Sequence, residues 1–236
     1  MFFNKFKSLS QYFSRLEKAI LLISVVLIIT FFAVFDRENY LSLISSLIGV
    51  FSLIFSAKGN PVGQVLMIVF SVLYGIISFG FRYYGEMITY VGMTLPMAIF
   101  ALVSWLKNPY EANKSEVKIR NLKKNEALIM VLLTIAVTLI FYFILKHFNT
   151  ANLIPSTISV ATSFLAAYLT FMRSIYFTLA YAANDVVLII LWVLASLRDI
   201  SYISVVICFI VFLVNDLYGF CNWRKMKIRQ ESRGNI

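Results

Sequence analysis

The chain of 236 residues is 61% hydrophobic and only 14% charged, with a formal net charge of +10. This composition indicates a membrane protein that spans the bilayer many times and leaves no residues over for a soluble domain. The basic residues are spread over several connections and do not gather in one patch. They therefore argue against a nucleic-acid-binding protein.

Eight apolar runs are long enough to cross a bilayer, whose hydrocarbon core needs about 20 residues per helix. They predict an all-α polytopic membrane protein. The first run is expected to be a retained helix, because it lacks the small-residue exit of a cleaved signal peptide. In chain order the predicted spans are Lys18–Phe35, Tyr40–Ala57, Pro61–Phe81, Glu86–Leu106, Ala127–Lys146, Leu153–Met172, Ile175–Ser196 and Ser201–Asn222.

Lys and Arg residues are concentrated in alternate connections. Seventeen of the 21 lie in the two tails or in the gaps after the second, fourth and sixth runs, and four lie in the other gaps. Cytoplasmic segments carry the excess of Lys and Arg. We therefore expect a cell-membrane protein with both termini in the cytoplasm, where the basic flanks face anionic lipid head groups.

The second and sixth runs carry matching stripes of small and hydroxyl residues, spaced 3, 4, 3 and 4 along one helical face. Every pair differs by 114 positions: Ser42, Ser45, Gly49, Ser52 and Ser56 against Ser156, Ser159, Ser163, Ala166 and Thr170. The fourth and eighth runs both end in Trp followed by basic residues, at Trp105 and Trp223. These matches predict two parallel three-helix repeats, as in some transporters.

The predicted organisation has one extra N-terminal helix and a 3+1+3 arrangement. The connection Lys107–Glu126 is expected to be solvated. The segments are a cytoplasmic tail (1–17) that lies at the membrane interface, an additional transmembrane helix (18–38), the first repeat (39–106), a cytoplasmic loop and linker helix (107–152), the second repeat (153–223) and a basic cytoplasmic tail (224–236).

Polar side chains inside a bilayer are costly and usually face the bundle interior or a water-filled cavity. Two Asn-Asp pairs stand out, Asn184-Asp185 in the seventh run and Asn215-Asp216 in the eighth. Tyr181, Asn184 and Trp192 share one helical face, which predicts contact with a flat polar ligand. For the two aspartates, interhelical hydrogen bonding is the alternative.

The third and fourth runs add polar residues of their own. Gln64 and Tyr74 lie on one face of the third run, and Thr94 lies two residues before Pro96 in the fourth. A proline inside a span predicts a kink and a released backbone carbonyl.

Little in the sequence favours an enzyme or a metal site. His147 is the single histidine, and no HExxH or GxSxG motif is present. Cys208 and Cys221 lie on one predicted helix, about 20 Å apart, so they cannot pair. No cofactor is expected.

These residues, in this order, resemble the PnuC family of vitamin transporters. The resemblance covers about residues 40–225. It rests on Tyr74-Gly75-Ile76-Ile77-Ser78, Arg82-Tyr83-Tyr84-Gly85-Glu86, Trp105-Leu106-Lys107-Asn108-Pro109, Asn184-Asp185 with Trp192, and Asn215-Asp216-Leu217-Tyr218-Gly219-Phe220 followed by Trp223.

The resemblance implies a fold similar to the SWEET sugar transporters, with a central site between the repeats. It implies uptake of nicotinamide riboside by facilitated diffusion, without an ion or ATP. Trapping would follow through phosphorylation by a cytoplasmic ribosylnicotinamide kinase. It also implies a trimeric assembly.

Nicotinamide riboside has a cationic ring, a carboxamide and a ribose. We expect amide or hydroxyl contacts from Asn184 and Gln64, stacking on Trp192 and Tyr74, and a favourable charge from Asp185. Thr94, Ser163, Tyr181 and Asn215 complete the predicted site.

Other readings of the same residues remain. Thiamine or another nucleoside-like vitamin would suit the same residue types. A proton-coupled nucleoside importer would use Asp185 and Asp216 as titrating groups. A purely structural or lipid-binding protein would not need Asn-Asp pairs in two corresponding helices.

Overall fold

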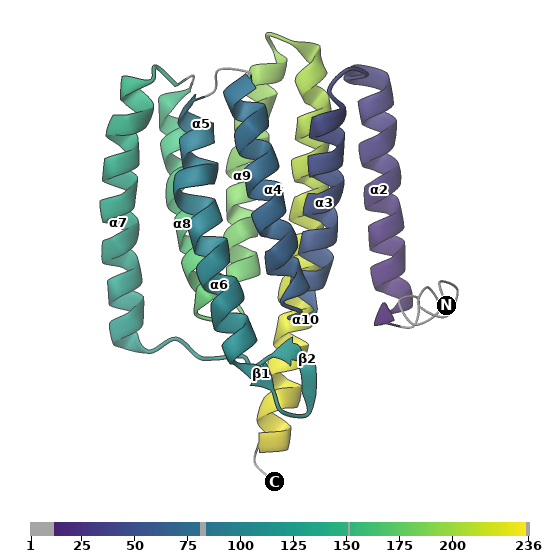
Figure 1. The fold of residues 1–236 in the computed structure, drawn as a ribbon, viewed down its shortest axis with the longest axis vertical. Coiled ribbons are helices and arrows are strands. Elements are labelled where there is room, and N and C mark those ends of the chain that lie inside the picture. The colour runs from purple at the N-terminus through teal and green to yellow at the C-terminus, as the bar shows by residue number, and fades with distance from the viewer. Residues whose placement is uncertain (1–11, 81–83, 151, 235–236) are drawn as a thin grey trace.

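The computed structural model of the protein describes residues 12–80, 84–150 and 152–234. Eight helices in these ranges are long and apolar enough to cross a membrane, which confirms the all-α polytopic class (Figure 1). The elements are α2 (Arg15–Phe35), α3 (Tyr40–Ala57), α4 (Val62–Gly80), α5 (Tyr84–Thr89), the π-helical segment η1 (Tyr90–Thr94), α6 (Leu95–Lys107), β1 (Pro109–Tyr110), β2 (Asn113–Val117), α7 (Lys124–His147), α8 (Leu153–Phe171), α9 (Phe177–Ser196), the 3₁₀ turn η2 (Ile200–Tyr202) and α10 (Ile203–Gly234).

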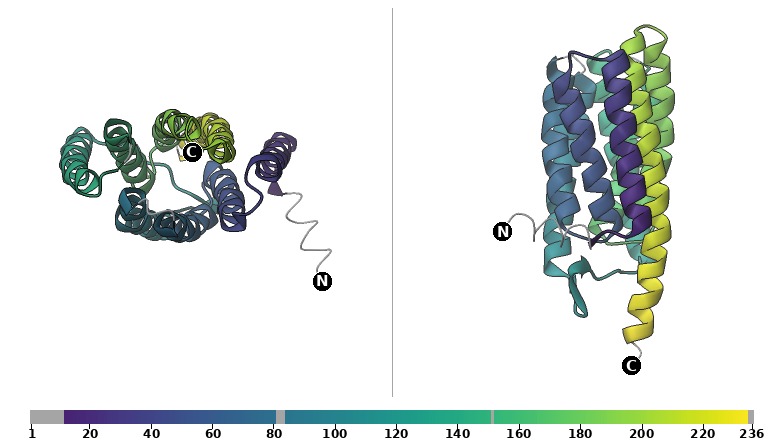
Figure 2. Two further views of the ribbon diagram at one scale, coloured as in Figure 1. Left: turned by 90° about the horizontal axis from the view of Figure 1, so that it is seen from above. Right: turned by 90° about the vertical axis from the view of Figure 1, so that its right-hand side faces the viewer.

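Six spans form a closed ring when the bundle is viewed along its axis (Figure 2). In order around the ring they are α3, α4, α5–η1–α6, α8, α9 and α10, and α10 returns to α3. Helix α2 packs outside the ring against α3 and α10, and α7 packs outside it against α8. The two remaining helices thus lie at opposite ends of an elongated cross-section.

Helix α2 begins, and α10 ends, at the end of the bundle that carries the short β1–β2 hairpin (Figure 1). We call this end the hairpin side and the other end the opposite side. The capping box of Ser14 and Glu17 starts α2 here, because each side chain accepts a backbone N–H of the other residue.

Contacts on the hairpin side recur at the offset found in the sequence. The indole N–H of Trp105 donates to the carbonyl of Thr170 at 2.9 Å, and that of Trp223 donates to the carbonyl of Ser56 at 2.9 Å. Ser56 and Thr170 are 114 positions apart, and each ends the first helix of its predicted repeat. Each repeat therefore hydrogen-bonds the other in the same way, which supports the two-repeat interpretation.

The turns after α3 and α8 also match. Gly59 has φ of +66° and Arg173 has φ of +58°, so both turns end in a left-handed residue 114 positions apart. Glycine reaches this conformation without strain, whereas arginine does not. Helices α3 and α8 run in the same direction (Figure 1), as expected for parallel repeats.

The segment after α6 is packed more tightly than the sequence suggested. Val117 is fully buried, its N–H donates to the carbonyl of Gly59, and Arg120 N–H donates to the carbonyl of Arg173. The buried carboxylate of Glu116 pairs with Arg229 of α10. The expectation of a solvated connection was wrong for this part, because strand β2 bonds to the left-handed turn at Gly59 and the residues just after it bond to the turn at Arg173.

Two further expectations can be compared with the structure. Leu95 N–H bonds to Tyr90 O in η1, so a π-helical turn directly precedes Pro96. Helix α10 continues to Gly234, through most of the segment expected as a tail. Of the residues that carried the family resemblance, Arg82 and Tyr83 lie outside the described residues, as does most of the predicted interfacial tail, 1–11.

Candidate functional site

A small cavity lies inside the ring, near the middle of the spans. All six spans of the ring contribute to it, and it holds about 50 Å³ of free space. Its lining residues are Gly49, Leu53, Met67, Phe70, Tyr90, Thr94, Ser163, Tyr181, Asn184, Asp185, Leu188, Phe209, Phe212 and Asp216. We call it the central cavity.

Asn184 is the best-anchored polar group of the central cavity. Its Oδ1 accepts hydrogen bonds from three hydroxyls of α8, at 2.8 Å from Thr162, 3.0 Å from Ser163 and 3.3 Å from Ser159. The small-residue stripe of α8 thus presents its hydroxyls to α9. Because the oxygen is occupied, the Nδ2 group is the part of this side chain that can serve a ligand as a donor.

Two carboxyl groups also meet in the wall of the central cavity. Asp185 of α9 and Asp216 of α10 are each 4% exposed and lie within hydrogen-bonding reach of each other. Asp185 Oδ2 is buried and has no hydrogen-bond partner among the described residues. None of the described residues that line the cavity is Lys, Arg or His.

Aromatic rings separate the central cavity from a larger pocket on the opposite side. The rings of Tyr74 and Tyr90 are 4.4 Å apart, and Phe70 packs at 5.5 Å from Tyr74 and 6.0 Å from Tyr90. Tyr90 lines the central cavity, whereas Tyr74 lines the larger pocket.

The larger pocket, which we call the outer pocket, has a volume of about 570 Å³. That is in the range of small-molecule sites, whereas the central cavity is below it. Trp192 and Tyr202 form an aromatic wall with ring centroids 5.4 Å apart. Four carboxylates also line it: Asp36, Glu38, Glu86 and Asp199.

The two aspartates at the mouth of the outer pocket differ in their titration. Burial raises the pKa of Asp36 above its usual value, although backbone N–H groups oppose this effect. The pKa of Asp199 is lowered, because the backbone N–H of Ser201 stabilises the charged form. Arg37 is turned back onto its own helix, where its Nε donates to the carbonyl of Ala33 at 2.7 Å.

The hairpin side of the bundle is closed by large buried side chains. The rings of Trp105 and Trp223 lie 5.5 Å apart, and Phe177 packs edge-on against Trp223 at 4.7 Å. Val117 of the hairpin and Met226 of α10 belong to the same buried cluster. These buried side chains fill the interior of the bundle on the hairpin side.

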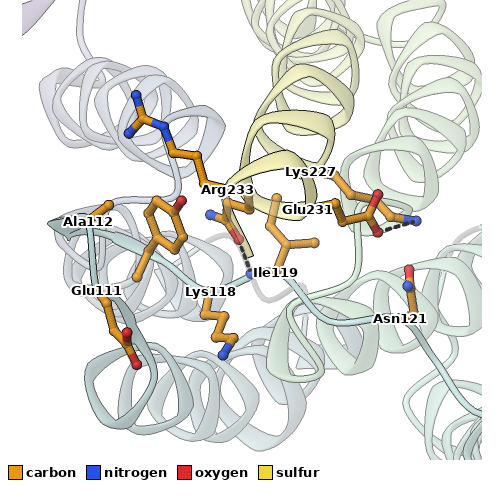
Figure 3. A pocket seen from close by; sticks show the side chains of 10 residues that line it. Glu111, Ala112, Lys118, Ile119, Asn121, Lys227, Glu231 and Arg233 are labelled. Atoms are coloured by element: carbon orange, nitrogen blue, oxygen red, sulfur yellow. Dashed lines mark hydrogen bonds and ion pairs between the residues drawn. The ribbon is translucent and has the colours of Figure 1, made fainter. Parts of the chain in front are cut away.

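A mixed-charge groove lies on the hairpin side, between the hairpin and the last turns of α10 (Figure 3). Lys227 and Glu231 form an ion pair there at 3.8 Å. Both signs of charge line this groove, so it offers no single charge for a ligand to match. Among the described residues no group of His, Cys, Asp and Glu could hold a metal ion.

The structure divides the nine predicted site residues among four places. Five of them line the central cavity: Thr94, Ser163, Tyr181, Asn184 and Asp185. Tyr74 and Trp192 line the outer pocket instead. Gln64 is buried toward the hairpin side, where its Nε2 donates to Ser56 Oγ at 3.3 Å. Asn215 donates to Ser24 Oγ of α2 at 3.1 Å, and it joins two helices.

Several cavity residues were not predicted. Phe70, Tyr90 and Phe212 line the central cavity but were not among the predicted site residues, because aromatic residues are common in membrane spans. One signal was available for Phe70, which lies 114 positions before Asn184. The repeat therefore places these two residues at matching points of the cavity wall.

Comparison with known proteins places the chain in a family. The family described as "Nicotinamide mononucleotide transporter" matches residues 39–225. The chain belongs to this family. The resemblance to PnuC proteins is thereby confirmed.

Two relatives named PnuC are each 22% identical to this chain. One is the "Nicotinamide riboside transporter PnuC" of Neisseria mucosa, over 85% of this chain and 78% of the relative. The other, of Haemophilus influenzae and with the same name, aligns over 80% of this chain and 81% of its own length.

The fold of the family is also found in a solved structure. "Crystal structure of the Vitamin B3 transporter PnuC" superposes with a TM-score of 0.78 at 22% identity, and covers 92% of this chain and 94% of that one. This likeness supports the arrangement of helices described above.

Proposed function

We propose that the protein carries nicotinamide riboside across the cell membrane. The observation that carries this proposal is the chemistry of the central cavity, which pairs an anchored amide with two carboxyl groups and aromatic rings. A cationic ring suits carboxyl groups and aromatic faces. A carboxamide and a ribose suit the amide of Asn184 and its neighbouring hydroxyls.

The same chemistry favours the riboside over the mononucleotide that names the family. A phosphate group is usually held by Arg, Lys or the N-terminus of a helix. None of the described cavity residues is basic, and Asp185 and Asp216 would repel a phosphate. The names of the two relatives agree with this choice.

The proposal includes the way in which transport is driven. The protein makes no chemical change in its substrate and takes no energy from an ion or ATP. A cytoplasmic ribosylnicotinamide kinase traps the imported riboside by phosphorylating it. The hairpin side is cytoplasmic, because 15 of the 18 Lys and Arg residues within the described ranges lie at that end. The working assembly in the membrane is a homotrimer.

The test is uptake of labelled nicotinamide riboside into proteoliposomes that contain the purified protein. We expect uptake to the equilibrium level, without a proton gradient, and competition by unlabelled riboside but not by thiamine. The Asn184→Leu variant should lose uptake while it keeps the same melting temperature within a few degrees.

Other outcomes would replace parts of the proposal. Uptake that requires a proton gradient would favour the proton-coupled importer that uses Asp185 and Asp216. Uptake of thiamine or riboflavin alone would move the protein to another vitamin. Unchanged uptake by Asn184→Leu would show that the central cavity is not the site.

A further inference from the structure

The carboxyl pair of the central cavity has a property that ordinary helix packing does not require. Asp185 and Asp216 are both 96% buried, yet they face each other and not a basic side chain. Two ionised carboxylates in contact inside a bilayer would repel strongly. A proton held between them removes this repulsion and leaves one negative charge on the pair.

The remaining charge is available to a ligand. Asp185 Oδ2 is buried, has no hydrogen-bond partner among the described residues, and belongs to a side chain of the cavity wall. A buried carboxylate oxygen normally has a partner, so an unpartnered one indicates a place for a donor or a positive charge.

The groups around the pair are neutral or weakly polar. Its described electrostatic neighbours are Tyr90 on η1, Tyr181 on α9 and Cys208 on α10. The cavity residues from α3 and α4 are Gly49, Leu53, Met67 and Phe70, and α8 contributes Ser163. The described protein therefore supplies no cation of its own to match the charge of the pair.

We propose that the Asp185–Asp216 pair selects charge in the central cavity: it carries one negative charge, and it pairs with one positive charge on a flat ring of the ligand. This inference rests on the proposed function and adds a basis for selecting a cationic ligand over a neutral one. The pair keeps its shared proton when the cation binds, so one negative charge meets one positive charge and nothing is transferred.

The test compares two ligands that differ in little but charge. Nicotinamide riboside carries a pyridinium cation, whereas its reduced dihydro form is neutral and nearly the same size. Binding of each to the purified full-length protein is measured by calorimetry at neutral pH. We expect the cation to bind about 10- to 100-fold more tightly than the neutral form.

Substitutions then locate the selectivity. In Asp216→Asn, the new amide donates to Asp185 in place of the shared proton, so one negative charge remains and the preference for the cation should persist. In the double variant with Asp185→Asn and Asp216→Asn no charge remains, and the two ligands should bind equally. Glu231→Gln, which removes an exposed carboxylate farther along α10, is the matched control and should change nothing.

Each outcome decides a different question. Equal binding of the two ribosides to the unaltered protein overturns the charge-selection proposal and leaves the proposed function intact. A preference that survives in the double variant also overturns it. Binding of neither riboside to the unaltered protein overturns the proposed function, and this inference with it. The comparison in the unaltered protein does not depend on the folding of any variant.

Discussion

Trp105 and Trp223 lie 5.5 Å apart on the hairpin side, and each donates its indole N–H to the end of the first helix in the opposite repeat. Both side chains are almost fully buried, at 1% and 0% exposed. A neighbouring pair repeats the pattern, since Ser104 donates to the carbonyl of Phe171 and Asn222 to that of Ala57. The two three-helix units are thus tied together by the same contacts used twice.

The paired tryptophans lead to a prediction about stability. Trp105→Phe and Trp223→Phe should each destabilise the protein by about 1–3 kcal/mol, because each removes an indole hydrogen bond and leaves unfilled space in a buried cluster. If the two contacts are equivalent, the two losses should be similar. Unfolding in detergent, followed by near-ultraviolet circular dichroism, measures them. A loss confined to one variant would argue against equivalent repeats.

Substitutions of Asn184 and Asn215 should distinguish a residue that binds the ligand from one that packs helices together. Asn184→Ala removes the Nδ2 donor of the central cavity and the acceptor of Ser159 and Ser163, so it should weaken riboside binding by about tenfold or more. Asn215→Ala removes the link to Ser24 and should lower stability by about 1 kcal/mol without a comparable change in affinity. Calorimetry and thermal unfolding of both variants provide the comparison, and the reverse assignment of effects would contradict it.

The outer pocket should attract cations before they reach the central cavity. Asp199→Asn should slow riboside entry at low salt, because the pocket loses one of four carboxylates. High salt should remove most of the difference from the unaltered protein, because ions screen the exposed charges. Initial uptake rates at two salt concentrations measure the effect. An equal reduction at both concentrations would indicate a structural role instead.

A fall in pH should weaken the attraction of the outer pocket for cations, because its carboxylates become protonated one after another. The pKa of Asp36 is raised and that of Asp199 is lowered, so of these two aspartates Asp36 takes up a proton at the higher pH. Asp36→Asn should therefore make the entry rate less sensitive to mildly acidic pH than it is in the unaltered protein. Uptake rates along a pH series test this order, which would be wrong if Asp199→Asn alone removed the sensitivity.

The β1–β2 hairpin and the residues just after it should help to hold the hairpin side of the bundle together. Glu116→Gln weakens its link to Arg229 and should speed hydrogen exchange at the amides of Val117 and Arg120, which bond to the two left-handed turns. Glu111→Gln, at an exposed carboxylate of the same hairpin, is the control. Unchanged amide exchange in Glu116→Gln would show that backbone hydrogen bonds alone hold this segment in place.

The sequence predicted the helices well because bilayer thickness and apolar run length determine them. The run predicted as Tyr40–Ala57 is helix α3 with the same bounds. The seventh predicted span, Ile175–Ser196, begins two residues before α9. The stripe predicted in α8 faces α9, since Ser159 and Ser163 donate to Asn184.

The site was harder to predict, because helical periodicity gives a face but not a depth or a neighbour. Trp192 shares a face with Asn184, yet it lies about two turns farther along α9 and lines the outer pocket. Gln64 faces inward but meets Ser56 near the closed end. The hairpin was missed because Val117 and Glu116 find their partners more than 50 residues away, in Gly59 and Arg229.

The most direct measurement is calorimetric titration of the purified protein with nicotinamide riboside and, separately, with nicotinamide mononucleotide. An acidic cavity without a described basic residue predicts binding of the riboside and at least about tenfold weaker binding of the mononucleotide, since a phosphate would face two carboxyl groups. Binding of the mononucleotide as tightly as the riboside would contradict the assignment of substrate to this cavity.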